Sequence, residues 1–361
     1  MYGTCFDPAK LTLLLSVQGH LPPTETVEMA GFSFDNPTDT DLRLYHPSHL
    51  VSSGIFAGTV PGPIPGPNGS PPDSADTGYA IRARLLDRFN ANPTYIGKFA
   101  AIYPEAAGGR ITFAMIGAAL AEFQLGNTFA DAPIDRFARG NHHAMTEGQK
   151  RGALLFFGKA NCVACHAVAG KSNEMFSDFE NHVAGIPQIA PAGFGLRPGG
   201  NPLNPADFPG NFLFSGPNFD EDFGLEELSG DPLDRYKFRT SPLRNLAVQA
   251  AFFHNGSFTR LDRALRYHLN TVAAAPGYDP AAEGLDADLT VRRGPIEPVL
   301  KRLDPLLVAL GKNPLTSMEY SDLLVFVRDG LLDTRILPAN LCSQVPATVP
   351  SGIRQQVFQG C

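Results

Sequence analysis

Apolar residues in this chain recur mainly at the three- and four-residue spacing of an amphipathic helix. From residue 81 onward, several segments place large apolar side chains on one stripe, which predicts helices packed on a common core. These segments are residues 81–89, 93–99, 111–125, 146–157, 259–268, 300–310 and 315–332. Residues 111–125 are apolar on most faces and predict a buried helix. No segment alternates apolar and polar residues as a half-buried strand does, so the pattern indicates a mainly α protein.

Capping residues predict where three of these helices begin. Thr146 followed by Gln149 forms a capping box, in which each side chain bonds the backbone N–H of the other residue. The pattern recurs at Thr259 with Asp262 and at Thr316 with Glu319. We therefore expect helices to start at these three threonines.

Two long segments show no periodicity. Residues 31–77 include the run Val60–Pro67, whose prolines remove backbone donors and favour extended conformations. Residues 171–235 are rich in Gly, Pro, Asn and Phe, and we interpret them as a long loop without a sheet. The chain therefore combines helices with large excursions, in keeping with its 36 glycines and 32 prolines among 361 residues.

Charge and hydropathy argue against two classes of partner. The net charge is −7, which makes nucleic acid an unsuitable ligand. The apolar run Leu11–Val17 is far shorter than the roughly 20 residues that span a bilayer. We therefore expect neither nucleic-acid binding nor a membrane span.

The chemistry of the chain is concentrated at Cys162–His166, which reads Cys-Val-Ala-Cys-His. Cys-x-x-Cys-His is the attachment signature of c-type haem. Cys162 and Cys165 lie on one side of a helical turn, so each can form a thioether with a haem vinyl group. His166 then supplies an imidazole nitrogen as the fifth ligand of the iron.

Two other interpretations of this motif lack their usual context. A zinc site needs a second pair of ligands at short range, and none follows in the sequence. A thioredoxin-like dithiol follows a strand and usually lacks the adjacent histidine. The motif therefore favours haem, and residues 171–235 are then expected to lie over the haem edge.

The helix expected after Thr259 provides a candidate sixth ligand. By their spacing, His268, Leu261 and Leu265 share one face, whereas Tyr267 falls on the opposite, polar face. A histidine on a buried apolar face needs a polar partner. That partner is either the haem iron or a backbone carbonyl, and the haem predicted in the same domain favours the iron.

His254 is the rival of His268. It precedes Asn255–Gly256, a turn signal, so it would lie at a loop tip near the porphyrin, as a ligand or as a hydrogen-bonding neighbour. Met115 and Met175 are interpreted as packing residues. If His268 binds, nitrogen fills both axial positions, and the iron is low-spin and suited to electron transfer rather than to O–O cleavage.

Several motifs around these residues resemble those of the bacterial di-haem cytochrome c peroxidase and MauG family, in the family's order. They are Ile134–Phe137 with Gly140, Gly152–Lys159 leading into Cys162–His166, Lys237–Asn245, Phe252–Phe258 and Val349–Ile353. The resemblance implies two mainly helical, cytochrome c-like haem domains. We assign residues 1–145 to the remainder of an N-terminal peroxidatic domain, 146–335 to the C-terminal haem domain and 336–361 to a tail.

The resemblance implies roles for residues near the C-terminal haem. The electron-transferring haem of the family matches Cys162, Cys165 and His166. Its sixth ligand is a Met or a Tyr in the family, at a position that aligns with His268. This departure predicts a haem with two histidine ligands and a lowered reduction potential.

Three further residues take their expected roles from the resemblance. Thr240 and Pro242 align with residues that offer backbone carbonyls to a calcium ion between the two domains. Arg244 either helps to hold the haem propionates or is a structural or exposed arginine.

The peroxidatic pocket of the family is represented by Gln18 and Glu28, which are spaced like the polar pair that lines it. A carboxylate there can shuttle the proton of the peroxide. However, the chain has no second Cys-x-x-Cys-His and no Trp, although the family has a Trp between its two haems. We expect that about a hundred N-terminal residues, the size of a small domain, are missing together with the second haem.

The activity implied by the resemblance is reduction of hydrogen peroxide with electrons from a small cytochrome c or cupredoxin. One alternative is a MauG-like enzyme that oxidises a partner protein, and another is a mono-haem electron carrier. The resemblance also allows a homodimer.

A periplasmic location follows from the predicted c-type haem, which is attached outside the cytoplasm. No signal peptide is recognisable, so we expect either a removed leader or a missing start. In such an oxidising compartment Cys342 and Cys361 could pair, or they could remain thiols, and Cys5 would stay unpaired.

Overall fold

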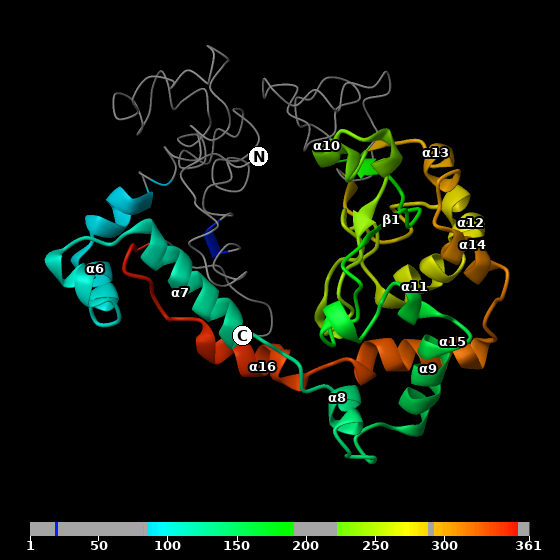
Figure 1. Cartoon of the computed structure of the whole chain (residues 1–361), viewed down its shortest axis with the longest axis horizontal. Helices are drawn as coiled ribbons and strands as arrows, with labels where there is room; N and C mark the ends of the chain where they lie inside the picture. The colour runs from blue at the N-terminus through cyan, green and yellow to red at the C-terminus, as the bar shows by residue number, and fades with distance from the viewer. Residues whose placement is uncertain (1–18, 21–81, 83–84, 191–221, 288–291, 353–360) are drawn as a thin grey trace, which may run out of the picture. The chain divides into compact units, whose positions relative to one another are not determined.

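The computed structural model describes residues 19–20, 82, 85–190, 222–287, 292–352 and 361 (Figure 1). Two compact units divide the chain, residues 1–128 with 342–361 and residues 129–341. Most of the described residues with regular structure are helical, which confirms the predicted mainly α class. The domain boundaries expected at residues 145 and 335 stay a prediction.

The first unit contains a small helical core. Residues 85–90 are helical, and they are followed by α6 (Pro93–Ala100), η3 (Pro104–Gly108) and α7 (Phe113–Gly126). Asn92 caps α6, because its side chain accepts hydrogen bonds from the first backbone N–H groups of that helix. Met115 on α7 is 6% exposed and lies in this core, as predicted.

The prediction of a buried helix over residues 111–125 is correct only in part. The buried residues of α7 are Met115, Ile116, Gly117 and Ala121, whereas Phe123 is 61% exposed and Leu125 is 51% exposed. An apolar sequence on most faces does not show which face of the helix is buried.

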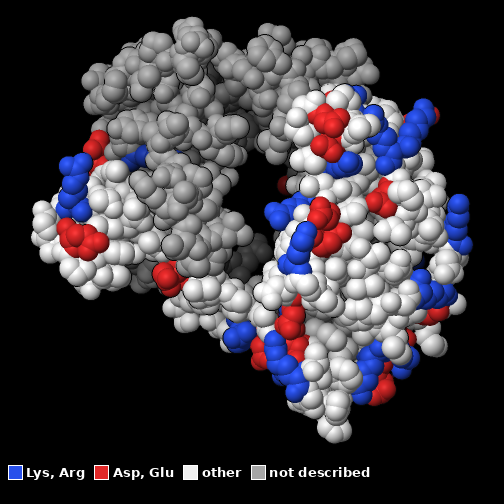
Figure 2. Space-filling model, in the orientation of Figure 1, with Lys and Arg blue, Asp and Glu red and all other residues white. Residues whose placement is uncertain are grey.

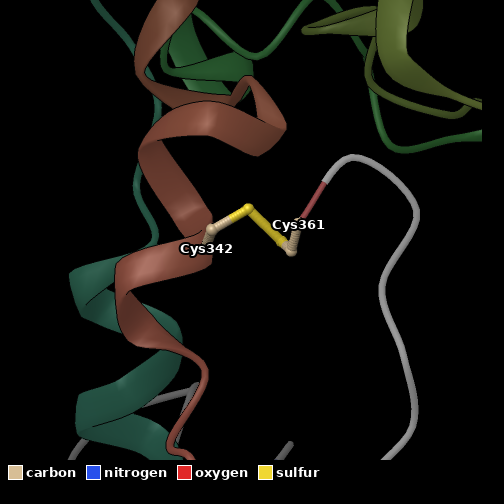
Figure 3. The surroundings of a disulfide bond; sticks show 2 residues. All are labelled: Cys342 and Cys361. Carbon is tan, nitrogen blue, oxygen red and sulfur yellow. A yellow bond between two sulfur atoms is a disulfide. The ribbon is translucent and has the colours of Figure 1, made fainter.

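The tail of this unit carries a disulfide bond between Cys342 and Cys361 (Figure 3). It links η12 (Cys342–Gln344), which follows α16 (Pro338–Leu341), to the last residue of the chain. Of the two states that the sequence left open for these cysteines, the structure shows the paired one. Cys5 lies outside the described residues.

The second unit is organised around two helices, α9 (Glu147–Phe157) and α15 (Ser317–Val325), which is continued by the π-helical turn η10 (Phe326–Gly330). The capping boxes predicted at their N-termini both form. Between the helices, Phe156 and Phe326 are fully buried with their rings 5.5 Å apart. The close approach of the two helices depends on Gly152 of α9, because a Cβ atom at this position would lie 2.1 Å from the backbone carbonyl oxygen of Asp322 in α15.

The helix predicted to begin at Thr259 begins later. Arg260 is the N-cap of α11 (Leu261–Leu269), and the hydroxyl of Thr259 donates instead to the carbonyl of Glu283, at 2.6 Å. A hydroxyl engaged by a distant carbonyl cannot cap its own helix, so the predicted capping box at Thr259 is wrong.

The helix predicted over residues 300–310 is interrupted near its start. One helix, α13 (Glu297–Leu300), ends at Leu300, and the next, α14 (Pro305–Gly311), begins after Asp304, whose side chain accepts a hydrogen bond from the N–H of Leu306. Pro305 explains the division, because proline is disfavoured inside a helix and favoured in its first turn. The remaining short helices are α8 (Pro133–Ala138), η4 (Cys162–Ala164), η5 (Gly170–Ser172), α10 (Glu226–Ser229), η6 (Pro232–Asp234), η7 (Leu246–Val248), α12 (Thr271–Ala274), η8 (Ala275–Gly277) and η11 (Thr334–Ile336).

Residues 171–235 are not the plain loop that we predicted. This segment contains two short strands, and each pairs with a strand later in the chain. The strand β1 (Asn181–His182) pairs antiparallel with β3 (Phe238–Arg239), and β2 (Ile189–Ala190) pairs antiparallel with β4 (Arg292–Arg293). Strands of two residues are too short to show an alternating pattern in the sequence, which is why they were missed. Residues 191–221 lie outside the described part of the chain.

The described surface shows mixed charge. Acidic and basic side chains lie next to each other in Figure 2. Ion pairs of the second unit include Arg151 with Asp322 and Lys159 with Glu319. Among the described residues, no helix combines the length and the apolar character that crossing a membrane requires.

The crossing of α9 and α15 makes a prediction about two glycines of one helix. Gly152→Ala should lower the free energy of unfolding by about 2–3 kcal/mol, because the new methyl group meets backbone that cannot move aside. Gly148→Ala is the matched control. Its nearest neighbour is the Asp322 carboxylate at 3.4 Å, so helix propensity should leave stability unchanged or slightly raised. Urea denaturation measures both, and equal effects would contradict the packing described.

Candidate haem site

The haem-attachment motif follows directly on α9. The chain turns at Asn161, which has a left-handed backbone (φ 47°), and enters η4, which carries Cys162 and brings Cys165 close behind it. Both cysteines are free and half-buried. Burial raises the pKa of Cys162 to about 12 and that of Cys165 to about 11. Redox-active dithiols have lowered pKa values, so this environment argues against that alternative.

His166 is oriented by a hydrogen bond to the segment that follows it. Its Nδ1 lies 3.0 Å from the backbone carbonyl of Phe176. Because a carbonyl only accepts, Nδ1 carries the proton and Nε2 is left with a free lone pair, the arrangement that a metal-binding imidazole needs. Burial lowers the pKa of His166, which favours this neutral form.

His268 on α11 lies beside His166, with their ring centroids 6.4 Å apart. It is half-buried, and its Nδ1 is buried with no hydrogen-bond partner among the described residues. Burial, with a smaller contribution from His166, lowers the pKa of His268 to about 4. A buried polar atom without a partner is rare, and it fits a side chain that bonds a group other than protein.

The separation of the two rings fits one iron between them. A metal–nitrogen bond to histidine is about 2 Å long, so two imidazoles on opposite sides of one metal have their centroids about 6 Å apart. The observed 6.4 Å agrees with that spacing. The ring separation and the lowered pKa values of His166 and His268 fit two imidazole ligands of one iron. Haem attachment at the free cysteines 162 and 165 stays a prediction.

Tyr267 contradicts its predicted place on the polar face of α11. It is 5% exposed, and its ring packs against Phe258 with centroids 4.9 Å apart. Its hydroxyl donates to the carbonyl of Gly185, at 2.5 Å. The apolar ring of a tyrosine can be buried when its hydroxyl finds an acceptor, which the helical pattern alone does not show.

His254 is occupied elsewhere. Its ring stacks on Phe238 with centroids 3.5 Å apart, and its Nε2 lies 3.0 Å from the carboxylate of Asp222. The residue before it, Phe253, has its ring 6.1 Å from that of His268. The described contacts thus favour His268 over His254 as the partner of His166.

Arg244 is part of a buried ion pair. Its two terminal nitrogens donate to the carboxylate of Asp135, each at 2.8 Å, and its Nε donates to the carbonyl of Glu174, also at 2.8 Å. These contacts support the structural role that the sequence left open. Contact with a haem propionate stays a prediction.

The calcium site expected at Thr240 and Pro242 also stays a prediction. The backbone carbonyl of Thr240 accepts a hydrogen bond from the hydroxyl of Ser177 at 2.7 Å, and Pro242 is half-buried. The predicted pocket residues Gln18 and Glu28 lie outside the described part of the chain.

A charged cluster that no sequence pattern indicated lies beside Cys165. The ring of His182 contacts two carboxylates, with Nδ1 2.8 Å from Asp304 and Nε2 3.0 Å from Asp178. Asp178 and His182 also lie close to Cys165. One potential metal-ligand atom from each of these three residues lies within 4.8 Å of the other two. Asp304 lies 122 residues from His182 in sequence, so no local pattern could reveal the contact.

The surroundings of His182 favour its protonated form. Both ring nitrogens face carboxylate oxygens, which accept hydrogen bonds from a protonated ring. Burial alone would lower the pKa of His182, but the hydrogen bonds to Asp304 and Asp178 outweigh it and raise that pKa. The pKa of Asp178 is lowered. Burial alone would raise it, but hydrogen bonds from the N–H of Glu180 and from the ring of His182 outweigh that effect. If Cys165 forms the predicted thioether, it has no free thiol to offer a metal in this group.

Curated proteins of known activity include relatives of this chain, although no protein-family model matches it. Cytochrome-c peroxidase IdrP2 of Denitromonas iodatirespirans is 30% identical over 213 residues, 54% of each chain. The methylamine utilization protein MauG of Methylorubrum extorquens is 29% identical over 51% of this chain and 42% of its own. Cytochrome c peroxidase Ccp of Escherichia coli is 26% identical, over 51% and 33%. The chain spans about half the length of these relatives or less.

Solved structures with similarity include a MauG-like protein associated with microbial copper homeostasis. It is 27% identical with a TM-score of 0.46, over 70% of this chain and 63% of its own. The diheme peroxidase BthA from Burkholderia thailandensis is 20% identical with a TM-score of 0.44, over 77% and 63%. Such distant similarity supports no argument by itself.

The cluster around His182 predicts a pH-dependent contribution to stability. Because its folded-state pKa is raised above the ordinary 6.5, its contribution is complete below that value and is lost as the pH rises through the folded-state pKa. The pKa of Asp178 is lowered, so its contribution to stability is present above its ordinary pKa of 3.8 and is lost as the pH falls through its folded-state pKa. His182→Gln should therefore cost about 1–3 kcal/mol near pH 5–6 and less above pH 7.

Denaturant titrations of the wild type and the variant at several pH values measure this difference. His142→Gln serves as the control, because His142 is exposed and its replacement should give a small difference that does not vary with pH. A constant cost of His182→Gln from pH 5 to pH 9 would show that His182 is neutral in the folded protein.

Proposed function

Because this chain is a relative of the bacterial di-haem cytochrome c peroxidases and MauG, we propose that it binds one haem c and transfers electrons in a peroxide-reducing oxidoreductase. The observation that carries the proposal is the approach of two neutral histidine rings, His166 and His268, beside the free cysteines 162 and 165. The relatives supply the reaction class, and the geometry supplies the residues.

Each residue of the site has a defined task. A bound haem supplies reversible one-electron chemistry. Cys162 and Cys165 would hold it covalently, and His166 and His268 would supply imidazole ligands to its iron. The Phe176 carbonyl keeps the His166 proton on Nδ1, so that Nε2 remains available for the iron. Two imidazole ligands would favour electron transfer by the bound group over its direct reaction with peroxide.

The further parts of the proposal rest on the family relationship. Hydrogen peroxide would be reduced at a second haem, with Glu28 moving its proton and Gln18 lining the pocket. The electrons would come from a small cytochrome c or cupredoxin, in the periplasm. Calcium bound by the carbonyls of Thr240 and Pro242, and assembly into a homodimer, belong to the same proposal.

A mono-haem electron carrier is the second candidate. The single Cys-x-x-Cys-His motif and the closed coordination by two histidines favour it. MauG-like oxidation of a partner protein is a third possibility, supported by the MauG relatives.

The coordination is tested with His268→Ala in the haem-loaded full chain. The wild type should show a six-coordinate low-spin absorption spectrum, and the variant should become high-spin because one axial nitrogen is lost. His254→Ala is the matched control and should leave the spectrum low-spin, since His254 contacts Phe238 and Asp222. A low-spin His268→Ala together with a high-spin His254→Ala would reverse the assignment.

The reaction is tested with full chain expressed in a periplasm together with haem-attachment machinery. Its intact mass should exceed the polypeptide mass by one haem, and Cys162→Ala with Cys165→Ala should abolish that increment. Reduced small cytochrome c should then be oxidised by the protein in a peroxide-dependent way. Reversible reduction of the haem without peroxide consumption would favour the electron carrier, and protein without haem would refute the proposal.

A further inference from the structure

We propose that Arg244 is a positioning residue for His166. Paired with Asp135, it clamps the segment 173–179 so that the carbonyl of Phe176 stays on the Nδ1 proton of His166. The inference rests on the proposed binding of haem by Cys162–His166 and concerns a pair of residues outside the coordination sphere. It assigns the buried charge of Arg244 a function other than binding a propionate.

The segment 173–179 has an unfavourable backbone. Four non-glycine residues, Asn173, Glu174, Phe176 and Phe179, have φ angles of 44°, 64°, 58° and 59°. Side chains larger than that of glycine are disfavoured in this left-handed region, by roughly 1–2 kcal/mol per residue. Such a conformation persists only where surrounding contacts impose it. The shape of this segment must therefore be enforced from outside.

Part of the enforcement comes from the haem motif itself. The segment folds back so that three of its N–H groups donate to carbonyls within and just after that motif. These hydrogen bonds join Asp178 to Cys165 at 2.8 Å, Ser177 to Ala167 at 3.0 Å and Glu174 to Val168 at 3.0 Å. They fix the two sides of the turn, and the carbonyl of Phe176 lies between them, 3.0 Å from His166 Nδ1.

The remaining enforcement comes from Arg244. Its Nε donates to the carbonyl of Glu174, a left-handed residue two positions before Phe176. Its guanidinium carbon lies 5.4 Å from the centre of the Phe176 ring, which also packs against the ring of Phe156, at 5.7 Å. Arg244 therefore holds both the backbone before Phe176 and the Phe176 side chain.

Asp135 fixes Arg244 in turn. The two form a bidentate pair in which Arg244 is 8% exposed and Asp135 5% exposed. Charge-assisted bidentate pairs are strong and directional. Asp135 is itself held on α8, where its carboxylate accepts the N–H of Ala132 at 2.8 Å. The clamp thus joins α8 to the segment that carries the carbonyl.

The hydrogen bond that the clamp maintains sets the electron density on the iron ligand. An imidazole that donates from Nδ1 to a carbonyl is a better electron donor through Nε2, which stabilises the oxidised metal. Loosening the clamp should weaken this bond, raise the reduction potential and expose the Nδ1 proton to solvent. A residue that only stabilised the core would change neither of these properties.

The test compares Arg244→Lys, Asp135→Asn and the double variant in the haem-loaded full chain. Each variant should raise the midpoint potential and speed the exchange of the His166 Nδ1 proton, followed by NMR, by at least about tenfold. Because the two residues act as one unit, the double variant should show little more than either single variant. Asp135→Asn removes the charge but keeps the shape of the side chain, and it provides the test if the Arg244→Lys variant does not fold.

Arg335→Lys is the matched control. Arg335 forms an ion pair with the buried Asp333 in the same unit, so its replacement should cost stability while leaving the potential and the proton exchange unchanged. A shift in potential without faster exchange of the His166 proton would overturn the clamp in favour of direct contact with the haem. Unchanged values in all variants would overturn it as well, whereas a wild type without haem would refute the proposed function instead.

Discussion

In the second unit, the described structure holds two imidazoles at the separation expected for two ligands of one metal ion. His166 and His268 are separated by about a hundred residues, and their rings lie 6.4 Å from each other. Burial lowers the pKa values of both, which keeps their nitrogens able to bind a metal. The buried Nδ1 of His268 has no hydrogen-bond partner among the described residues, and a bound group beside the two rings would compensate for their lost hydration.

The helices and the irregular segments divide the work of holding these rings. The tight crossing of α9 and α15, possible because residue 152 is glycine, gives a rigid base from which the chain enters η4. The strained segment 173–179 then orients His166, and the Tyr267 hydroxyl, bonded to Gly185, fixes the end of α11 that carries His268. Irregular backbone therefore occurs where a particular side-chain direction is needed.

Local sequence signals predicted much of this arrangement. The capping boxes at Thr146 and Thr316, the haem motif and the stripe that includes His268 each depend on residues a few positions apart. Contacts between residues far apart in the sequence could not be predicted in this way. The hydroxyl of Thr259 bonds Glu283, His182 bonds Asp304, and Arg244 bonds Asp135, and in each case a contact across the fold decides the role. No spacing rule for a single sequence contains that information.

The family relationship and the geometry lead to one central claim, that a single iron is bound by nitrogen from both His166 and His268. The near-infrared magnetic circular dichroism spectrum of the oxidised, haem-loaded chain tests this most directly, because its charge-transfer band depends on the pair of axial ligands. The account predicts a low-spin band typical of two imidazoles. A high-spin band, or a low-spin band typical of one imidazole and one thioether sulfur, would contradict it.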